Sequence, residues 1–304
     1  MGEDALWPDL PFATWSETCD TLHRFVQIAG KIRMAFTPLV NHWWNVTLYV
    51  TPRGLTTSPI PCGTRTFAIN FDFIEHRLRI DVSDGGAESF ALGPMPVCDF
   101  YHAVMERLRA LGIEVHIWTM PCEIDTNVRF EDDRAHAHYD PVYVDRFRRV
   151  LQQSDRVMKA FRARFIGKVS PVHFFWGSFD LAVTRFSGRT APPMERGAPN
   201  TAAWVMREAY SHEVSSCGFW PGNGGYGRAA FYSYAYPEPA GFKNVKPTTP
   251  GAFYDQGLSQ FILPYDAVRT ASDPDAMLLG FFQETYEAAA DFGKWDRQAL
   301  ERSS

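Results

Sequence analysis

The chain has 304 residues, which is enough for one large core or for two domain-sized halves that share a core. Its formal net charge is −5, and because a broad nucleic-acid-binding surface normally needs a basic domain, we do not expect DNA or RNA as a partner. The five cysteines are widely scattered without a C-x-x-C pair, which favours free thiols in a reducing cytosol over a disulfide framework.

The first residues, Met1-Gly2-Glu3-Asp4, are acidic and lack the basic and apolar regions of a secretory signal. No uninterrupted apolar stretch approaches the length that spans a bilayer. We therefore expect a cytoplasmic protein without a membrane partner.

The first half of the chain predicts a helix, a set of strands and a second helix. Thr14 and Glu17 match a capping box that opens a helix ending near Met34. Alternating apolar and polar residues then predict strands. The predicted strands are 42–51, 66–73, 78–83 and 113–118, and the second helix spans 96–111.

A polar connector at 119–140 is the best candidate boundary between an N-terminal half (1–118) and a C-terminal half (141–304). Asp140-Pro141 opens the second half as a helix cap, and Ser272-Asp273-Pro274 caps its last helix. Between them, strands are predicted at 172–184, 207–216 and 229–236. Runs of strands bracketed by helices predict an α+β fold. We expect two related halves, each a leading helix, a mainly antiparallel sheet and a closing helix, packed as one unit around an aromatic cleft.

Two segments suggest an internal repeat. One runs from Gly30-Lys31 through His42-Trp43-Trp44, and the other from Gly167-Lys168 through His173-Phe174-Phe175-Trp176. Each places a histidine beside large aromatic residues, so the two units could face one pocket.

Histidines in predicted strands are the sharpest catalytic candidates. His173 could be a metal ligand or a general base tuned by burial, or else a core histidine with one hydrogen bond. His212 shares a predicted strand face with Tyr210, as a proton-transfer pair or as an interior hydrogen-bonded pair. Asp180 could orient a histidine from a neighbouring strand, or face water.

The connector carries a possible metal site. His136 and His138 project to the same side of an extended segment, and Asp133 could add a carboxylate ligand for a divalent transition metal. Polar loops also gather such residues by chance. Gly222 to Gly227 satisfy G-x-G-x-x-G but lie between predicted strands, so we expect a loop and no nucleotide cofactor.

Aromatic and basic residues supply substrate-binding candidates. Arg53 and Arg185 follow the two repeat-like strands and could clamp a carboxylate or phosphate, or form salt bridges within the fold. A mixed pocket needs aromatic bodies with polar tips. The candidates for its lining are His42, Trp43, Trp176, Trp220, Tyr232 and Tyr234.

Several segments together resemble an uncharacterised bacterial family that is known only as a domain of unknown function. They are Trp7-Pro8-Asp9-Leu10-Pro11, Asn41-His42-Trp43-Trp44, Arg53-Gly54-Leu55-Thr56-Thr57, Ser170-Pro171-Val172-His173-Phe174-Phe175-Trp176-Gly177 and Ala209-Tyr210-Ser211-His212-Glu213-Val214. The resemblance covers nearly the whole chain. It implies one integrated unit and no particular activity.

The leading functional hypothesis is an enzyme for a small molecule, with histidine acid/base or metal-ligand groups in an aromatic cleft. One alternative is a non-catalytic binding module for an aromatic or hydrophobic ligand. Another is a protein-docking scaffold, which would need a large exposed apolar patch.

Overall fold

The computed structural model describes residues 6–195 and 197–302. The acidic start, Met1-Gly2-Glu3-Asp4, lies outside the described residues. Within the described part of the chain, no helix combines the length and the apolar character needed to cross a membrane.

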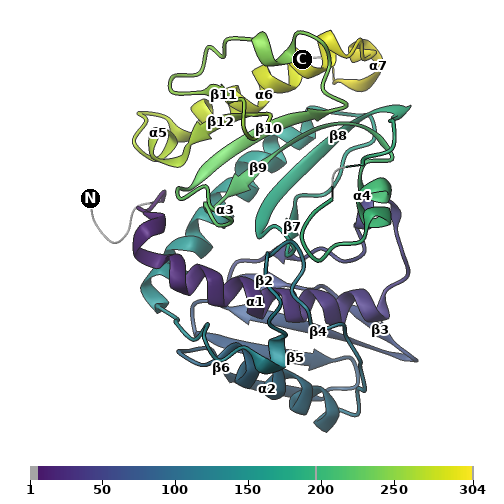
Figure 1. The fold of residues 1–304 in the computed structure, drawn as a ribbon, viewed down its shortest axis with the longest axis vertical. Helices are drawn as coiled ribbons and strands as arrows, with labels where there is room; N and C mark the ends of the chain where they lie inside the picture. Colours follow the sequence, from purple (N-terminus) through teal and green to yellow (C-terminus); the bar gives the residue numbers. More distant parts are fainter. Residues whose placement is uncertain (1–5, 196, 303–304) are drawn as a thin grey trace.

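Two antiparallel sheets of six strands each confirm the predicted α+β class (Figure 1). The N-terminal sheet has the order β1-β2-β4-β5-β6, with β3 beside β4. The C-terminal sheet has the order β11-β12-β10-β9-β8-β7. The N-terminal strands are β1 (Tyr49–Val50), β2 (Gly54–Thr56), β3 (Ile60–Cys62), β4 (Arg65–Asp72), β5 (Arg77–Val82) and β6 (Ala87–Ala91). The C-terminal strands are β7 (His173–Phe175), β8 (Asp180–Thr190), β9 (His212–Trp220), β10 (Ala230–Tyr236), β11 (Phe253–Asp255) and β12 (Gln260–Pro264).

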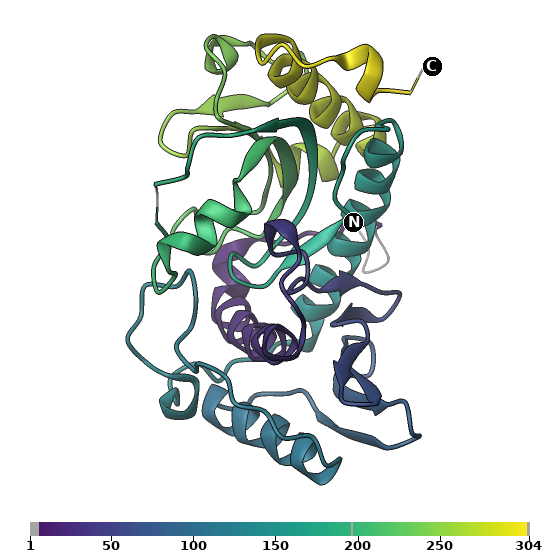
Figure 2. The same ribbon diagram turned by 90° about the vertical axis from the view of Figure 1, so that its right-hand side faces the viewer.

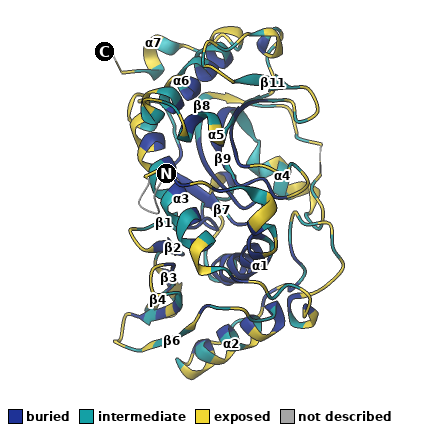
Figure 3. Cartoon of the chain, turned by 90° about the vertical axis from the view of Figure 1, so that its left-hand side faces the viewer, coloured by how far each residue is buried: buried dark blue, intermediate teal, exposed yellow. Residues whose placement is uncertain are grey.

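The long helix α1 (Phe12–Phe36) runs between the two sheets (Figures 1 and 2). Most of its residues are buried, as the dark blue of this helix shows (Figure 3). The ring of Phe25 stacks on Phe100 of α2 (Val97–Ala110) at 3.9 Å between centroids. One continuous hydrophobic core includes residues of α1 and of both sheets. The central helix is therefore shared by the two sheets.

The other two long helices, α3 (Pro141–Ala163) and α6 (Pro274–Phe292), pack together against the C-terminal sheet. Both begin where the sequence predicts. The Asp140 side chain accepts a hydrogen bond from the amide of Val142 at 2.8 Å, and Asp273 accepts one from Ala276 at 3.0 Å. The remaining helices are short: α4 (Ala203–Ala209), α5 (Tyr265–Arg269), α7 (Arg297–Leu300), η1 (Asn41–Trp43), η2 (Phe130–Asp132) and η3 (Phe242–Asn244).

Local predictions are confirmed for β4, β5, β10 and α2, where the apolar period is regular, but other elements differ from the prediction. Helix α1 begins at Phe12, and the Thr14 hydroxyl donates to the Pro11 carbonyl oxygen, so the predicted capping box is wrong. Residues 113–118 form no strand, and the predicted strand at 207–216 begins as helix α4. The predicted strand at 172–184 is two strands separated by a turn at 176–179.

The two repeat-like segments take different structures. Residues 42–44 belong to η1 and the turn after it, whereas 173–175 form β7. The predicted strand at 42–51 is reduced to Tyr49–Val50, because His42 and Trp43 have φ values of 59° and 61°, which a strand does not allow. The two segments nevertheless meet. Leu48 and Phe174 exchange two backbone hydrogen bonds of 2.9 and 2.8 Å and so connect the two sheets.

Candidate functional site

A cavity of about 400 Å³ lies against one face of the C-terminal sheet. Strands β8, β9 and β10 supply its floor, and α1, the 42–46 segment, the 118–123 segment and α4 supply its walls. Its size is within the range of small-molecule sites. The aromatic residues that line it are Trp43, Trp44, Trp118, Phe175, Trp176, Phe186, Trp204, Tyr210, Tyr232 and Tyr234.

Unusual backbone conformations gather around this cavity. Five non-glycine residues at or beside its wall have a positive φ: His42, Trp43, Glu123, Phe179 and Asn200. Such conformations cost free energy and persist where the surrounding structure enforces them, often at functional sites. This concentration of strained residues makes the cavity the candidate functional site.

Glu123 is a carboxylic acid at the cavity wall whose pKa is raised. Its φ is 58°, and its amide donates to the Pro199 carbonyl oxygen at 2.8 Å. The carboxyl group packs on Gly177, where an added Cβ would lie only 2.9 Å from Glu123 Cδ. The residue is exposed to solvent at the cavity wall, although many protein atoms lie around its carboxyl group. This desolvation, and then the nearby charge of Asp180, raise the pKa of Glu123 to about 7.

Asp180, at the start of β8, is the second carboxyl group of the cavity. It is buried and accepts hydrogen bonds from the hydroxyls of Ser178 and Tyr232. Burial raises its pKa, while the two hydroxyl donors oppose that shift. Next to it, the hydroxyls of Tyr210 and Tyr234 are 3.0 Å apart. The floor therefore holds two hydrogen-bonded sets of hydroxyls, and one of them surrounds the Asp180 carboxyl.

His42 is held in its neutral form at the cavity wall. Its Nε2 lies 2.8 Å from Lys168 Nζ, and its Nδ1 lies 3.1 Å from the Ala209 carbonyl oxygen. Because an ammonium only donates and a carbonyl only accepts, Nε2 accepts and Nδ1 carries the proton. Burial, and then the charge of Lys168, lower the pKa of His42.

A polar stripe on α1 positions two walls of the cavity. His23, Gln27 and Lys31 are four residues apart, so they share one helix face, and all three are buried. His23 Nε2 contacts the carbonyl oxygens of Trp176 and Gly177 at 3.0 and 2.9 Å. Burial is the main cause that lowers the pKa of His23 to about 4, so the ring is neutral.

Gln27 holds the segment that carries Glu123. Its Oε1 accepts from the amide of Cys122 at 2.8 Å, and its Nε2 donates to the carbonyl oxygen of Cys122 at 2.7 Å. Lys31 Nζ donates to Cys122 Sγ at 3.1 Å. Together with His23, these contacts fix Cys122 and Glu123 relative to the turn at 176–179.

Of the predicted site residues, the structure brings seven to the cavity: His42, Trp43, Trp176, Asp180, Tyr210, Tyr232 and Tyr234. Trp176 is anchored by its Nε1, which donates to the Val46 carbonyl oxygen at 2.8 Å. Tyr210 follows α4 and bonds to Tyr234, so it shares no strand face with His212.

His173 and Arg185 are buried away from the cavity lining. His173 is enclosed by the rings of Trp44, Tyr49 and Phe175, and burial, the largest cause, lowers its pKa to about 3. Arg185 points to the opposite face of the C-terminal sheet. There its guanidinium stacks on Phe161 of α3 at 3.5 Å and on Tyr286 of α6 at 4.2 Å. Neither side chain lines the cavity.

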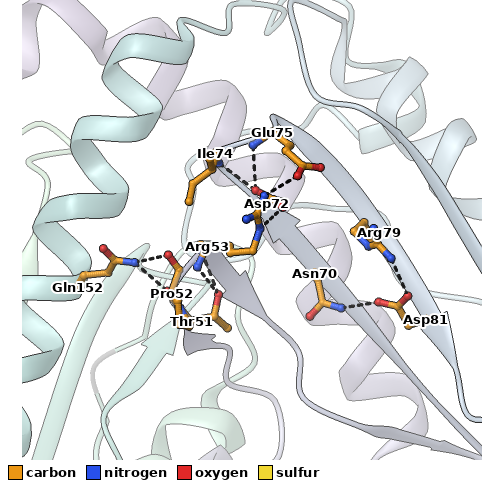
Figure 4. A network of polar contacts seen from close by, with 11 residues as sticks. Thr51, Pro52, Arg53, Asn70, Asp72, Ile74, Glu75, Arg79, Asp81 and Gln152 are labelled. Carbon is orange, nitrogen blue, oxygen red and sulfur yellow. Dashed lines mark hydrogen bonds and ion pairs between the residues drawn. The ribbon is translucent and has the colours of Figure 1, made fainter.

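His212, Trp220 and Arg53 also lie outside the cavity lining. His212 Nδ1 lies 3.1 Å from Ser211 Oγ, and Trp220 stacks on Tyr226 in the loop between β9 and β10. Arg53 belongs to a polar network of the N-terminal sheet, as Figure 4 shows. It pairs with Asp72 at 2.5 Å and with Glu75 at 2.8 Å, and Asp72 also accepts from the amides of Ile74 and Glu75. The contacts of Arg53 thus match the predicted alternative of a salt bridge within the fold.

The three metal-ligand candidates do not converge. Asp133 contacts His136 Nδ1 at 2.8 Å and pairs with Arg24 at 3.1 Å. His138 is exposed and lies 3.5 Å from Glu17. Among residues 6–195 and 197–302, no group of three or more His, Cys, Asp or Glu side chains is arranged to hold a metal ion.

Sequence reasoning misses Glu123, Cys122 and the α1 stripe. Glu123 and Cys122 sit in an irregular connector whose path only long-range contacts determine. One signal was available: His23, Gln27 and Lys31 are polar residues at four-residue spacing within a helix rich in apolar residues. Polar groups on a buried helix face need partners, so such a stripe indicates that other polar groups of the chain pack against this face.

Taken together, the two antiparallel sheets and the shared helix α1 define an α+β protein, with an aromatic cavity against one face of its C-terminal sheet. The chain belongs to a family of unknown function, DUF5996, whose sequence profile matches residues 7–302. This match confirms the resemblance to a domain of unknown function. Neither the curated proteins nor the solved structures contain a significant match to the chain.

Proposed function

We propose that the protein is an enzyme for a small, largely apolar or aromatic molecule, with Glu123 as the proton-transfer group. The observation that carries the proposal is the carboxyl group of Glu123, which a strained backbone holds in the cavity with a pKa of about 7. A general acid or base works best when its pKa is near the working pH, because both protonation states are then populated.

The neighbouring carboxyl has a complementary role. Asp180 is buried, is hydrogen-bonded by Tyr232 and Ser178, and helps to raise the pKa of Glu123. Two titratable groups in one pocket with different surroundings are typical of acid/base sites. The aromatic walls would bind the apolar part of the substrate and exclude water.

The proposal is tested by incubating the protein with a mixture of small cellular metabolites and following each mass by mass spectrometry. We expect the wild type to consume at least one molecule, and Glu123→Gln to slow that consumption by about 10²–10⁴-fold. Glu114→Gln is the matched control, because Glu114 is exposed and lies outside the cavity. Equal consumption by wild type and Glu123→Gln would contradict the role of Glu123.

A non-catalytic binding module is the second candidate, and the tryptophans favour it. Trp43 and Trp204 pack at 5.1 Å, and the indole NH of Trp43 donates to Val205, so the aromatic wall is preformed. This candidate predicts that a metabolite co-elutes with the wild-type protein and is recovered chemically unchanged. The same mass spectra therefore separate the two functions.

A further inference from the structure

Lys31 is a buried cation without a carboxylate partner. Its side chain is 0% exposed in the middle of α1. Across the described residues, no aspartate or glutamate forms an ion pair with it. Its hydrogen-bond acceptor is the thiol sulfur of Cys122, at 3.1 Å. Because a buried ammonium needs a compensating partner, the Cys122 sulfur is the group that supplies it.

Burial lowers the pKa of Lys31, whereas its contact with the Cys122 sulfur and two indole rings favour the charged form. Its Nζ lies 4.8 Å from the ring centroid of Trp118 and 5.8 Å from that of Trp176. The face of an indole ring attracts a cation and has no such attraction for a neutral amine. An ammonium held in this place attracts negative charge at the sulfur beside it, which is the arrangement of lysine beside reactive cysteines.

Cys122 is also placed to react. It lines the cavity, is only partly buried, and directly precedes Glu123. Gln27 bonds to both its amide and its carbonyl group, so the backbone that carries the sulfur is held in place. No other cysteine lines the cavity within the described chain. Cys62, on β3, is partly buried like Cys122 but lies outside the cavity.

We propose that Cys122 is a nucleophilic thiolate, paired with the Lys31 ammonium, that attacks the carbonyl carbon of an ester or thioester with an apolar or aromatic acyl group. This inference rests on the proposed function and names its substrate class. In the first step an S–C bond forms at Cys122 and the bond to the leaving group breaks. The leaving group takes the proton of the Glu123 carboxyl.

In the second step water attacks the carbonyl carbon of the acyl-enzyme. The Glu123 carboxylate accepts a proton from this water, and Cys122 leaves as a thiolate. The sum of the two steps is ester plus water giving acid plus alcohol, with both protein groups returned to their starting state. No oxidant or further co-reactant is required.

The first test detects the thiolate directly. The far-ultraviolet spectrum of Cys122→Ser is subtracted from that of the wild type at neutral pH. We expect a thiolate band in the difference spectrum, and its absence would overturn the pairing with Lys31. This measurement requires no substitution of Lys31 and therefore does not depend on the folding of a Lys31 variant.

The rate at which chloroacetamide alkylates Cys122 tests the same pairing. A thiol pKa lower by one unit raises the thiolate fraction about tenfold at neutral pH and lowers its nucleophilicity about threefold, so a net gain of about threefold is expected. Lys31→Met should therefore slow alkylation of Cys122 by about threefold or more. The rate at Cys62 in the same chain is the control. Equal slowing of both cysteines would overturn the pairing.

The second test uses p-nitrophenyl benzoate. We expect a burst of nitrophenolate of about one equivalent and a benzoyl group on Cys122 in a peptide map. Cys62→Ser should keep the burst and Cys122→Ser should lose it. No burst, or a burst that survives Cys122→Ser, would overturn the nucleophile. Because the burst needs no natural substrate, its failure is separable from failure of the metabolite assay with Glu123→Gln.

Discussion

Replacing Gly177 by alanine should disable the site while leaving the fold intact. A Cβ at Gly177 would lie 2.9 Å from Glu123 Cδ and closer still to Oε1. Ordinary carbon contacts lie at about 3.5–4.0 Å, so the carboxyl group must move away by at least about 0.6–1.1 Å. The clash involves the end of a flexible side chain, and Gly177 does not have a positive φ. We therefore expect the free energy of unfolding to change by less than about 1 kcal/mol.

The catalytic effect should be much larger. A displacement of about 1 Å in a reacting group can cost about 10²-fold in rate. The assay is the rate at which Gly177→Ala consumes the metabolite that the wild type consumes, together with urea unfolding of both proteins. Gly93→Ala is the control, because a Cβ at Gly93 would meet open space. A Gly177→Ala protein with wild-type turnover would show that the position of the Glu123 carboxyl is unimportant.

Three further predictions concern buried polar groups. The pKa of His173 is lowered to about 3 by burial, against 6.5 in an unfolded chain, so the unfolded chain binds the proton first as the pH falls. The free energy of unfolding should therefore fall by up to about 1.4 kcal/mol per pH unit below pH 6.5, and urea unfolding of His173→Phe should show a shallower dependence. Asp180→Asn should lower the pKa of Glu123 but leave it above 4.5, because desolvation is the larger cause; a carbon-13 NMR titration that finds no decrease would exclude the influence of Asp180. Gln27→Ala should cost about 1–3 kcal/mol in urea unfolding, because the backbone of Cys122 loses two hydrogen bonds, and an unchanged midpoint would argue against the clamp.

The fold was predictable where local chemistry and tertiary contacts agree. Helix α3 begins at a capping Asp140 followed by proline, and β4 alternates apolar and polar residues along its length. Both signals are contained in a few neighbouring residues. The 42–51 segment shows the limit of such patterns. It alternates like a strand, but contacts of His42 with Lys168 and Ala209 hold it in a compact turn.

The floor of the site was partly predictable and its reactive groups were not. Tyr232, Tyr234 and Asp180 lie on strands whose alternation places them on one face. Glu123 acquires its pKa from burial and from Asp180, which is 57 positions further along the chain. No local pattern in the connector contains that information, because the connector takes its path from contacts with α1.

The stripe on α1 has a practical consequence for finding the ligand. The helix that holds the cavity wall through Gln27 and Lys31 also packs into the core between both sheets. A molecule that binds the cavity of the folded protein and not the unfolded chain must then stabilise the whole chain, by about 2.7 kcal/mol at a concentration one hundred times its Kd. The melting temperature of the entire protein therefore reports whether the cavity is occupied, and it can be measured before any reaction is known.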